Sequence, residues 1–262
     1  LNKTFAGEKI SVAIAHDCRI KSDEFAQVIA NIFSSNGIDV YLFKALRPTP
    51  ELSFAIRLLG CKSGVVVTAS HNPKEYNGYK AYWDDGSQVV APHDKNIIDE
   101  VNAIKTIDDI KFEGDASKIH SIGEEVDAKY IDQILSLSIS KEAIARQKNL
   151  KIVFTPIHGT GVTLVPTLLS QMGFENVTVI AEQSEPNGNG HFPTVVYPNP
   201  EESEAMSMAV NKAKEIDADL VLGTDPDANR VGIAVKNHHG EIQLLNGNQT
   251  ATVLIYYLLQ AW

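Results

Sequence analysis

The stretch GVVVTASHNPKEYNGYKAYW, residues 64–83, joins an apolar strand to a polar loop and a returning strand. After Gly64, residues 65–68 form an unbroken, β-branched run typical of a strand buried on both faces, and residues 79–83 are predicted to form the next strand. Upstream, strands at 10–15 and 39–43 alternate with a helix capped by Ser22 and ended by Gly37, and with a helix capped by Thr49. This alternation predicts an α/β fold with a mostly parallel sheet.

A second run of the same kind follows a stretch of predicted helices and polar connections at residues 92–148. It consists of strands at 150–154, 177–180, 219–223 and 231–235, helices at 162–172 and 201–216, and a long Pro/Gly/Asn loop at 182–200. We therefore predict two domains, 1–146 and 147–240, each a mixed, mostly parallel sheet flanked by helices. Residues 241–262 are predicted to form a strand and an apolar helix that end the second domain or begin a third.

Composition excludes several classes of protein. The chain has 262 residues, 44% hydrophobic and 21% charged, with a formal net charge of −10. That balance argues against general nucleic-acid binding, because there is no basic surplus to neutralise phosphates. Two cysteines, Cys18 and Cys61, are too few for a disulfide framework. No apolar run approaches the length of a membrane span, so we expect a cytoplasmic protein with no membrane or obligate protein partner.

The loop after residue 68 places Ser70 at the carboxyl end of a predicted parallel strand, where α/β proteins bind ligands. A serine beside His71 suggests a nucleophile or phosphate carrier. Asn72-Pro73 indicates a turn, and a capped surface turn without chemistry is the alternative interpretation. The G-x-S-x-G frame of an acyl-transfer enzyme is absent.

A second polar loop, Asp225-Pro-Asp227-Ala-Asn229-Arg230, also follows a predicted strand. Two carboxylates and an amide oxygen at this spacing can converge on one hard cation. Arg230 could reach a phosphoryl oxygen held there. An Asx-rich turn without metal is the alternative.

The first loop, TASHNP followed by NGYK, resembles the active-site loop of the α-D-phosphohexomutases (the phosphoglucomutase/phosphomannomutase family). The resemblance implies that Ser70 is a phosphoserine that donates its phosphoryl group to a hexose phosphate and regains one from the bisphosphate. It also implies that His71 and Asn72 contact phosphate or sugar and that Lys80 is a general acid or base. The NGYKAYW continuation resembles the phosphoglucomutase and phosphopentomutase branch.

The second loop is similar to the family's D-x-D-x-D-R magnesium loop. Asp225, Asp227 and Arg230 match, whereas Asn229 stands where the family has a third aspartate, which predicts weaker Mg²⁺ binding. By the same resemblance, Ser70 completes the metal site, Arg19 of HDCR holds phosphate near the reaction centre, and His158 of TPIHGTG is a substrate contact.

The two loops lie 155 residues apart, and their joint resemblance implies one function. We expect interconversion of hexose 1-phosphate and hexose 6-phosphate, most closely as in phosphoglucomutases, with one Mg²⁺ and glucose 1,6-bisphosphate as intermediate. Alternatives are phosphomannomutase or phosphopentomutase specificity, a non-catalytic sugar-phosphate-binding module, and a haloacid-dehalogenase-like phosphatase with Asp225 as nucleophile. Family members have four domains, so the chain is expected to cover the first two and to show little turnover alone.

Overall fold

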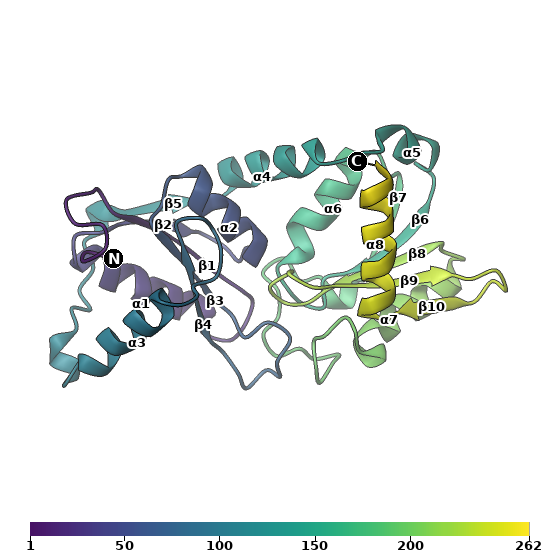
Figure 1. Cartoon of the computed structure of the whole chain (residues 1–262). Coiled ribbons are helices and arrows are strands. Elements are labelled where there is room, and N and C mark those ends of the chain that lie inside the picture. The colour runs from purple at the N-terminus through teal and green to yellow at the C-terminus, as the bar shows by residue number, and fades with distance from the viewer. Residues whose placement is uncertain (262) are drawn as a thin grey trace. The chain divides into compact units, whose positions relative to one another are not determined.

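The computed structural model describes residues 1–261, and their contacts divide them into two compact units, each with one five-stranded sheet (Figure 1). The first unit comprises Leu1–Asp17, Lys21–Ala69 and Asn77–Val126. The second comprises Cys18–Ile20, Ser70–Tyr76 and the chain from Asp127 onward. Two short loops from the first part of the chain therefore group with the second unit. The domain boundary near residue 147 stays a prediction.

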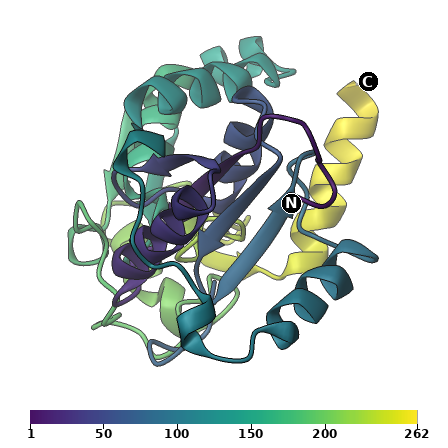
Figure 2. The same cartoon turned by 90° about the vertical axis from the view of Figure 1, so that its left-hand side faces the viewer.

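The first sheet has the strand order β4-β3-β1-β2-β5. Strands β1, β2, β3 and β5 run parallel in this sheet, and β4 pairs antiparallel with β3 (Figure 2). The elements in chain order are β1 (Ser11–His16), α1 (Ser22–Ser35), β2 (Asp39–Phe43), α2 (Thr49–Leu58), β3 (Ser63–Val67), β4 (Tyr79–Trp83), α3 (His93–Ala103) and β5 (Ile119–Ile122). The mixed, mostly parallel sheet is as predicted.

Alternation along β1 gives this sheet two apolar faces. Val12 and Ile14 pack with Ala26 and Ala30 of α1. The intervening alanines, 13 and 15, pack with Leu52 and other residues of α2. A strand covered on both faces needs apolar residues at every position, which explains its unbroken apolar sequence.

Three details differ from the sequence predictions. Thr49 is the first residue of α2 and not its cap, because Pro48 occupies the N-cap position. Residues 119–122 fall within a predicted helical region, but they form β5, an edge strand that pairs with β2. Ser22 does not cap α1, because Lys21 is the N-cap residue and the Ser22 hydroxyl donates to Asp17 Oδ1 at 2.8 Å. Between the two sheets in sequence lie α4 (Glu124–Ser136) and α5 (Lys141–Arg146).

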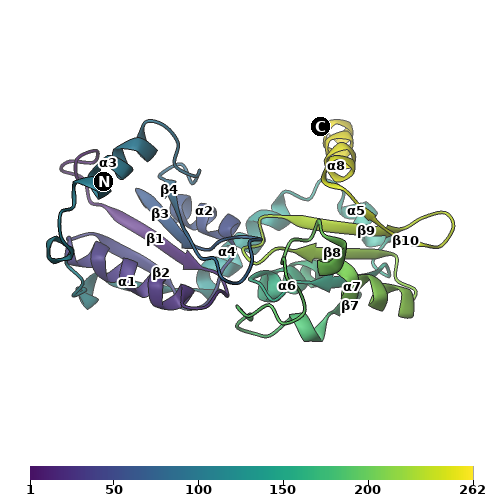
Figure 3. The ribbon, with the colours of Figure 1, turned by 90° about the horizontal axis from the view of Figure 1, so that it is seen from below.

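The second sheet has the order β10-β9-β8-β6-β7. β6 pairs parallel with β7 and β8, whereas β9 pairs antiparallel with β8 and β10 (Figure 3). The elements are β6 (Lys151–Thr155), α6 (Gly161–Met172), β7 (Asn176–Val179), α7 (Ser203–Glu215), β8 (Leu220–Thr224), β9 (Val231–Lys236), β10 (Ile242–Leu245) and α8 (Gly247–Ala261).

Helix α7 covers one face of this sheet mainly with alanines. Ala205, Met206 and Ala209 are buried and pack with Val153 and Val221 of the central strands. Small side chains allow the helix to approach the sheet closely.

The C-terminal strand and helix predicted for residues 241–262 are present as β10 and α8, and Trp262 lies outside the described residues. Apolar side chains of α8, including Ile255 and Leu259, are exposed. No helix within residues 1–261 is long and apolar enough to span a membrane.

Candidate active site

Ser70 lies three residues beyond the end of β3 and contacts the loop that follows β8. Its Oγ donates a hydrogen bond of 2.6 Å to Asp225 Oδ2, across 155 residues of sequence. Ser70 is only 8% exposed and has a left-handed backbone with φ of 52°. The two loops singled out in the sequence thus meet within the second unit.

The Asp225 carboxylate organises its own loop. Oδ1 accepts the backbone N–H groups of Asn229 (3.0 Å) and Arg230 (2.9 Å), which close the turn around the carboxylate. Ala228 takes up a positive φ of 48° within this turn. With the Ser70 hydroxyl on Oδ2, the carboxylate therefore joins the turn to the serine loop.

Asp225 and Asp227 are both completely buried. Burial first, and then the negative charge of Asp227, raises the pKa of Asp225 from 3.8 to about 7, although hydrogen bonds from Ser70 and Arg230 oppose the change. Two buried carboxyl groups this close destabilise each other when both are ionised. A bound cation would relieve that repulsion.

The donor set fits Mg²⁺. The two carboxylates, the Ser70 oxygen and the amide oxygen of Asn229 are hard oxygen ligands of the kind magnesium prefers. The Asn229 Nδ2 donates to Asp227 Oδ2 at 2.9 Å, which leaves its carbonyl oxygen as the available ligand atom. No group of three or more His, Cys, Asp or Glu side chains with metal-binding geometry occurs in the described part of the chain. Because position 229 is an asparagine, this loop offers only two carboxylates, Asp225 and Asp227, which agrees with that finding.

The other predicted site residues fall into two groups. His71 lies beside Ser70, with Nδ1 3.5 Å from Oγ, and Asn72 follows in the same loop. Arg230 is exposed next to the carboxylate turn. Lys80, by contrast, lies on β4 in the first unit, where it pairs with Val66. Its acid–base role stays a prediction.

Arg19 occupies a different environment from the phosphate contact that the resemblance implied. It is 3% exposed, and its guanidinium donates to backbone carbonyls of the serine loop. The acceptors belong to Ser70, Asn72, Pro73 and Tyr76. The buried guanidinium thus holds the backbone of the serine loop through its carbonyl groups.

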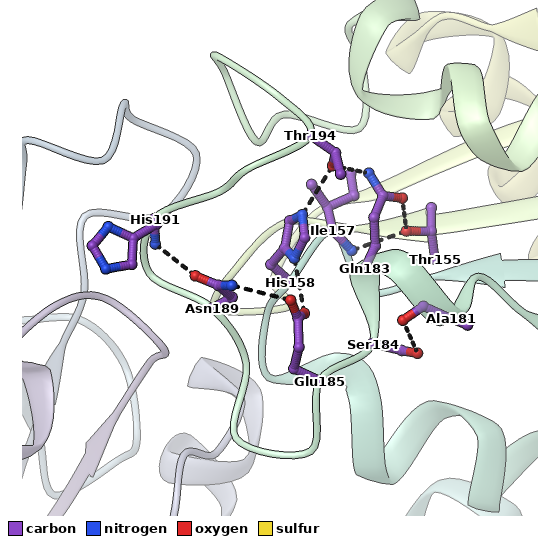
Figure 4. Close-up of polar contacts among 10 residues, drawn as sticks. All are labelled: Thr155, Ile157, His158, Ala181, Gln183, Ser184, Glu185, Asn189, His191 and Thr194. Carbon is purple, nitrogen blue, oxygen red and sulfur yellow. Dashed lines mark hydrogen bonds and ion pairs between the residues drawn. The ribbon is translucent and has the colours of Figure 1, made fainter.

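His158 is also placed differently from the substrate contact that was predicted. The ring is completely buried, with Nδ1 2.9 Å from Glu185 Oε2 and Nε2 2.9 Å from Thr194 Oγ1 (Figure 4). Gln183 extends the network by donating to Thr194 Oγ1 at 2.8 Å. Both ring nitrogens have protein partners, so His158 connects the β6–α6 turn to loop 182–200 and does not present a nitrogen to substrate.

Asp17 is a structural residue that the sequence analysis did not select. Its Oδ2 accepts the Thr68 hydroxyl at 2.7 Å and its Oδ1 accepts the Ser22 hydroxyl, which in turn accepts Asn77 Nδ2 at 2.9 Å. Thr68 and Asn77 flank the serine loop. Within the first unit, Asp17 therefore holds both ends of the segment that contains Ser70.

Backbone strain is concentrated around this site. Seven described residues other than glycine have positive φ, and five of them belong to loops of the second unit close to the serine or its supports: Ser70, Ile157, His158, Phe192 and Ala228. Each such residue costs on the order of 1 kcal/mol, and such residues cluster at functional sites. The long loop 182–200 was a further signal in the sequence, because loops of this length are often functional.

Comparison with protein families identifies both parts of the chain. A family model described as phosphoglucomutase/phosphomannomutase, alpha/beta/alpha domain I, matches residues 1–108. The model for alpha/beta/alpha domain II of the same family matches residues 128–240. Together the two models cover most of the chain.

Relatives of known name agree with the family models. A phosphoglucomutase of Staphylococcus epidermidis is 40% identical over 254 residues, which are 95% of this chain and 45% of that protein. A phosphoglucomutase of Staphylococcus aureus USA300 is 38% identical over 253 residues, with the same two coverages. The chain therefore spans less than half the length of these relatives.

The fold also matches solved structures. A protein of Thermus thermophilus assigned as a phosphomannomutase superposes with a TM-score of 0.79 at 26% identity, over 95% of this chain and 53% of that one. A phosphoglucomutase/phosphomannomutase family protein of Burkholderia thailandensis, at 22% identity and over 96% of this chain and 51% of that one, shares the fold with a TM-score of 0.72.

Proposed function

Because the chain belongs to the phosphoglucomutase/phosphomannomutase family, we propose that it carries the phosphoryl-transfer loops of a phosphohexomutase. The reaction is interconversion of hexose 1-phosphate and hexose 6-phosphate, with glucose phosphates as substrates, in the cytoplasm. The glucose preference is supported by the named Staphylococcus relatives, which are phosphoglucomutases.

The observation that carries this proposal is the hydrogen bond of 2.6 Å from Ser70 Oγ to Asp225 Oδ2. It joins a buried hydroxyl that could carry a phosphoryl group to a carboxylate turn suited to a divalent cation. A simple surface turn would not bury either group, and Asp225 is completely buried.

In the proposed reaction the phosphorylated Ser70 loses its phosphoryl group to a sugar hydroxyl. The bond from Ser70 Oγ to phosphorus breaks, a bond from the sugar oxygen to phosphorus forms, and the hydroxyl proton passes, with Lys80 as the base, to the released Ser70 oxygen. The product is glucose 1,6-bisphosphate. Transfer of the other phosphoryl group back to Ser70, with return of a proton to the released sugar oxygen, completes the exchange.

Mg²⁺ bound at this site would supply positive charge that stabilises the transferring phosphoryl group. Asp225, Asp227, Asn229 and the oxygen on Ser70 are the residues that would hold it. The chain's own role is to keep two carboxylates buried and adjacent, with Ser70 oriented toward them.

His71, Asn72 and Arg230 are proposed to bind the phosphate or sugar, because the first two adjoin Ser70 and the third follows the carboxylate turn. Since the chain spans 45% of the length of its relatives, we propose that the 262 residues assayed alone bind Mg²⁺ but give little mutase turnover. A coupled assay with glucose 1-phosphate that gave a normal rate would contradict this.

Intact-mass spectrometry tests the proposal. The chain is first freed of phosphate with a phosphatase and then incubated with glucose 1,6-bisphosphate and Mg²⁺. A phosphate-sized increment is expected in the wild type and in Ser87→Ala, an exposed-serine control, but not in Ser70→Ala.

Two other outcomes would overturn the proposal. An increment that persists in Ser70→Ala and is released by hydroxylamine would mark an acyl phosphate, as expected for a phosphatase with Asp225 as nucleophile. Binding of the bisphosphate without any covalent increment would indicate a sugar-phosphate-binding module.

A further inference from the structure

The side chain of Arg19 is surrounded by backbone carbonyl groups of the serine loop, residues 70–76. Its Nη1 donates to the carbonyl oxygens of Pro73 (2.7 Å) and Tyr76 (2.8 Å). Its Nη2 donates to the carbonyl oxygen of Ser70 at 2.7 Å and also to that of Asn72. Four carbonyls from one short segment, residues 70–76, thus converge on a single buried cation.

We infer that Arg19 is a positioning residue that sets the conformation of the Ser70 loop, and that residues 188–192 of the loop after β7 hold Arg19 in place. For the chemistry of Ser70 this inference rests on the proposed function; for the order of the loop it stands independently. The geometry assigns Arg19 a different task from contact with substrate phosphate.

A guanidinium suits this task. It is planar, permanently charged and has five N–H donors in a fixed fork, whereas a lysine ammonium is a compact, mobile charge. Because C=O and N–H point in opposite directions across a trans peptide, the Ser70, Pro73 and Tyr76 carbonyls turned toward Arg19 direct the N–H groups of the residues that follow them away from it. The side chain therefore orients the peptide groups of the loop.

The Ser70 carbonyl is one of the four acceptors, which links Arg19 to the reacting oxygen. Ser70 has a φ of 52°, an uncommon value for a residue with a side chain. Its bond to Arg19 stabilises the peptide in this conformation, from which Oγ reaches Asp225 Oδ2. Without the guanidinium, the Ser70 backbone would be free to leave this left-handed conformation.

Phe192 packs against the guanidinium group of Arg19. The guanidinium carbon lies 5.1 Å from the centre of the Phe192 ring, within the range of a cation–π interaction. Phe192 is buried and itself has a positive φ, of 46°. A strained, buried aromatic residue thus supports the cation that holds the serine loop.

Two glycines let the same segment approach the backbone of Cys18–Ile20. A Cβ atom at Gly188 would lie 2.3 Å from Cys18 Cβ. A Cβ atom at Gly190 would lie 2.6 Å from both the Cys18 oxygen and the Ile20 nitrogen. Neither position has room for a side chain, so the segment lies directly against the Arg19 turn.

His158 and Glu185 also bind this segment, through Asn189. The Asn189 backbone N–H donates to the His158 carbonyl at 3.0 Å, and Asn189 Nδ2 donates to Glu185 Oε1 at 3.1 Å, next to the His158 ring (Figure 4). A continuous set of contacts thus runs from His158 through residues 185–192 to Arg19 and the Ser70 loop, all within the second unit.

Limited proteolysis of the full 262-residue chain tests the inference without reference to activity. Lys74 is exposed in the serine loop, and Lys105 is exposed in the first unit and serves as reference. In Arg19→Gln we expect the trypsin cleavage rate after Lys74, divided by that after Lys105, to rise about tenfold, because the loop loses its central donor. Arg146→Gln, which removes an exposed arginine on α5, should leave the ratio unchanged. An unchanged ratio in Arg19→Gln would overturn the inference.

Phe192 provides a second pair of variants in case Arg19→Gln does not fold. Phe192→Leu removes the aromatic face and should raise the ratio about threefold, whereas Phe192→Tyr retains the face and should restore the wild-type ratio. Equal ratios in these two variants would contradict the role assigned to Phe192.

Uptake of phosphate by Ser70 from glucose 1,6-bisphosphate supplies the chemical readout. A positioning role predicts slower uptake in Arg19→Gln and Phe192→Leu but normal uptake in Phe192→Tyr. Normal uptake in Arg19→Gln would overturn the link to Ser70 chemistry. If the wild type takes up no phosphate, the proposed function fails, while the proteolysis ratio still decides whether Arg19 orders the loop.

Discussion

The first four strands of the two sheets have the same order, although the fifth strand pairs with β2 in one sheet and with β9 in the other, and the corresponding loops carry different chemical groups. In each, the first strand (β1 or β6) lies between the second (β2 or β7) and the third (β3 or β8), and an antiparallel fourth strand (β4 or β9) pairs with the third. The loop from third to fourth strand contains Ser70 in the first case and Asp225 in the second. Equivalent loops thus supply the hydroxyl and the carboxylates.

The turns after the first strands correspond as well. Arg19 lies three residues beyond the end of β1, and His158 three residues beyond the end of β6. Both are buried, and both bind a loop rather than facing solvent. In each sheet the side chain at this turn, Arg19 or His158, binds a neighbouring loop. The groups proposed to react, Ser70 and Asp225, lie instead in the loops that follow the third strands.

The comparison predicts its largest effect at Asp225, the carboxylate counterpart of Ser70. Asp225→Asn should weaken Mg²⁺ binding by at least about 100-fold, because a metal-ligand charge is lost from a buried site. Isothermal titration calorimetry would measure this, with the exposed α4 variant Asp132→Asn as control. Equal affinity in Asp225→Asn and wild type would mean that the β8–β9 loop does not bind the metal.

The next effect is expected at His158, the counterpart of Arg19. His158→Ala should lower the free energy of unfolding by about 2 kcal/mol, because Glu185 and Thr194 lose a buried partner. Urea unfolding followed by circular dichroism would measure the change. His238→Ala, in the exposed β9–β10 turn, should have little effect. A change at His158 no larger than at His238 would refute its loop-binding role.

Much of this fold was predictable because its signals are local. The apolar runs of β1, β3, β6 and β8 and the polar loops after them were identified from the sequence, and the structure confirms these strands. β5 was missed because its four residues, IHSI, place two polar residues between two isoleucines, which is neither an apolar run nor a strict alternation and gives a weak strand signal.

The sequence did not predict the roles of site residues whose hydrogen-bond partners lie far away along the chain. Arg19 finds its acceptors more than 50 residues away, and His158 finds Thr194 36 residues away. Composition and spacing near each residue contain no information about such partners. The family resemblance implied a phosphate contact for Arg19 and a substrate contact for His158, whereas both side chains are buried and hydrogen-bonded to protein loops.

A smaller effect on Mg²⁺ binding is expected at Asn229, in the loop that contains Asp225 and Asp227. Asn229→Asp should strengthen Mg²⁺ binding about fivefold, since one added charge near an exposed cation ligand contributes about 1 kcal/mol. The same calorimetric titration would show it. Weaker or unchanged binding in Asn229→Asp would argue that position 229 does not face the metal.

The smallest effect concerns Glu185, which binds His158. Burial alone would raise the pKa of Glu185, but hydrogen bonds from His158, from the Glu185 backbone and from Asn189 bring it below the ordinary value of 4.5. A lowered pKa stabilises the fold above pH 4.5, and that contribution is lost as the pH falls through the folded-state value.

Glu185→Gln should therefore lower the unfolding free energy at pH 7 by less than about 1 kcal/mol, since solvent screens this partly exposed group. The difference from wild type should shrink as the pH falls below 4.5. Thermal melts of both proteins between pH 7 and pH 4 would test this. A difference that stays constant across the range would contradict the assignment.

The most direct test of the central claim, that the Ser70 loop and the Asp225 loop form one site, is the Mg²⁺ affinity of the chain with and without phosphate on Ser70. Isothermal titration calorimetry on the two forms should give binding at least about tenfold tighter in the phosphorylated chain, because the phosphate adds charged oxygen ligands beside the two aspartates. The gain should disappear in Asp225→Asn. Equal affinity of the phosphorylated and unphosphorylated chains would show that the serine and the carboxylates act as separate sites.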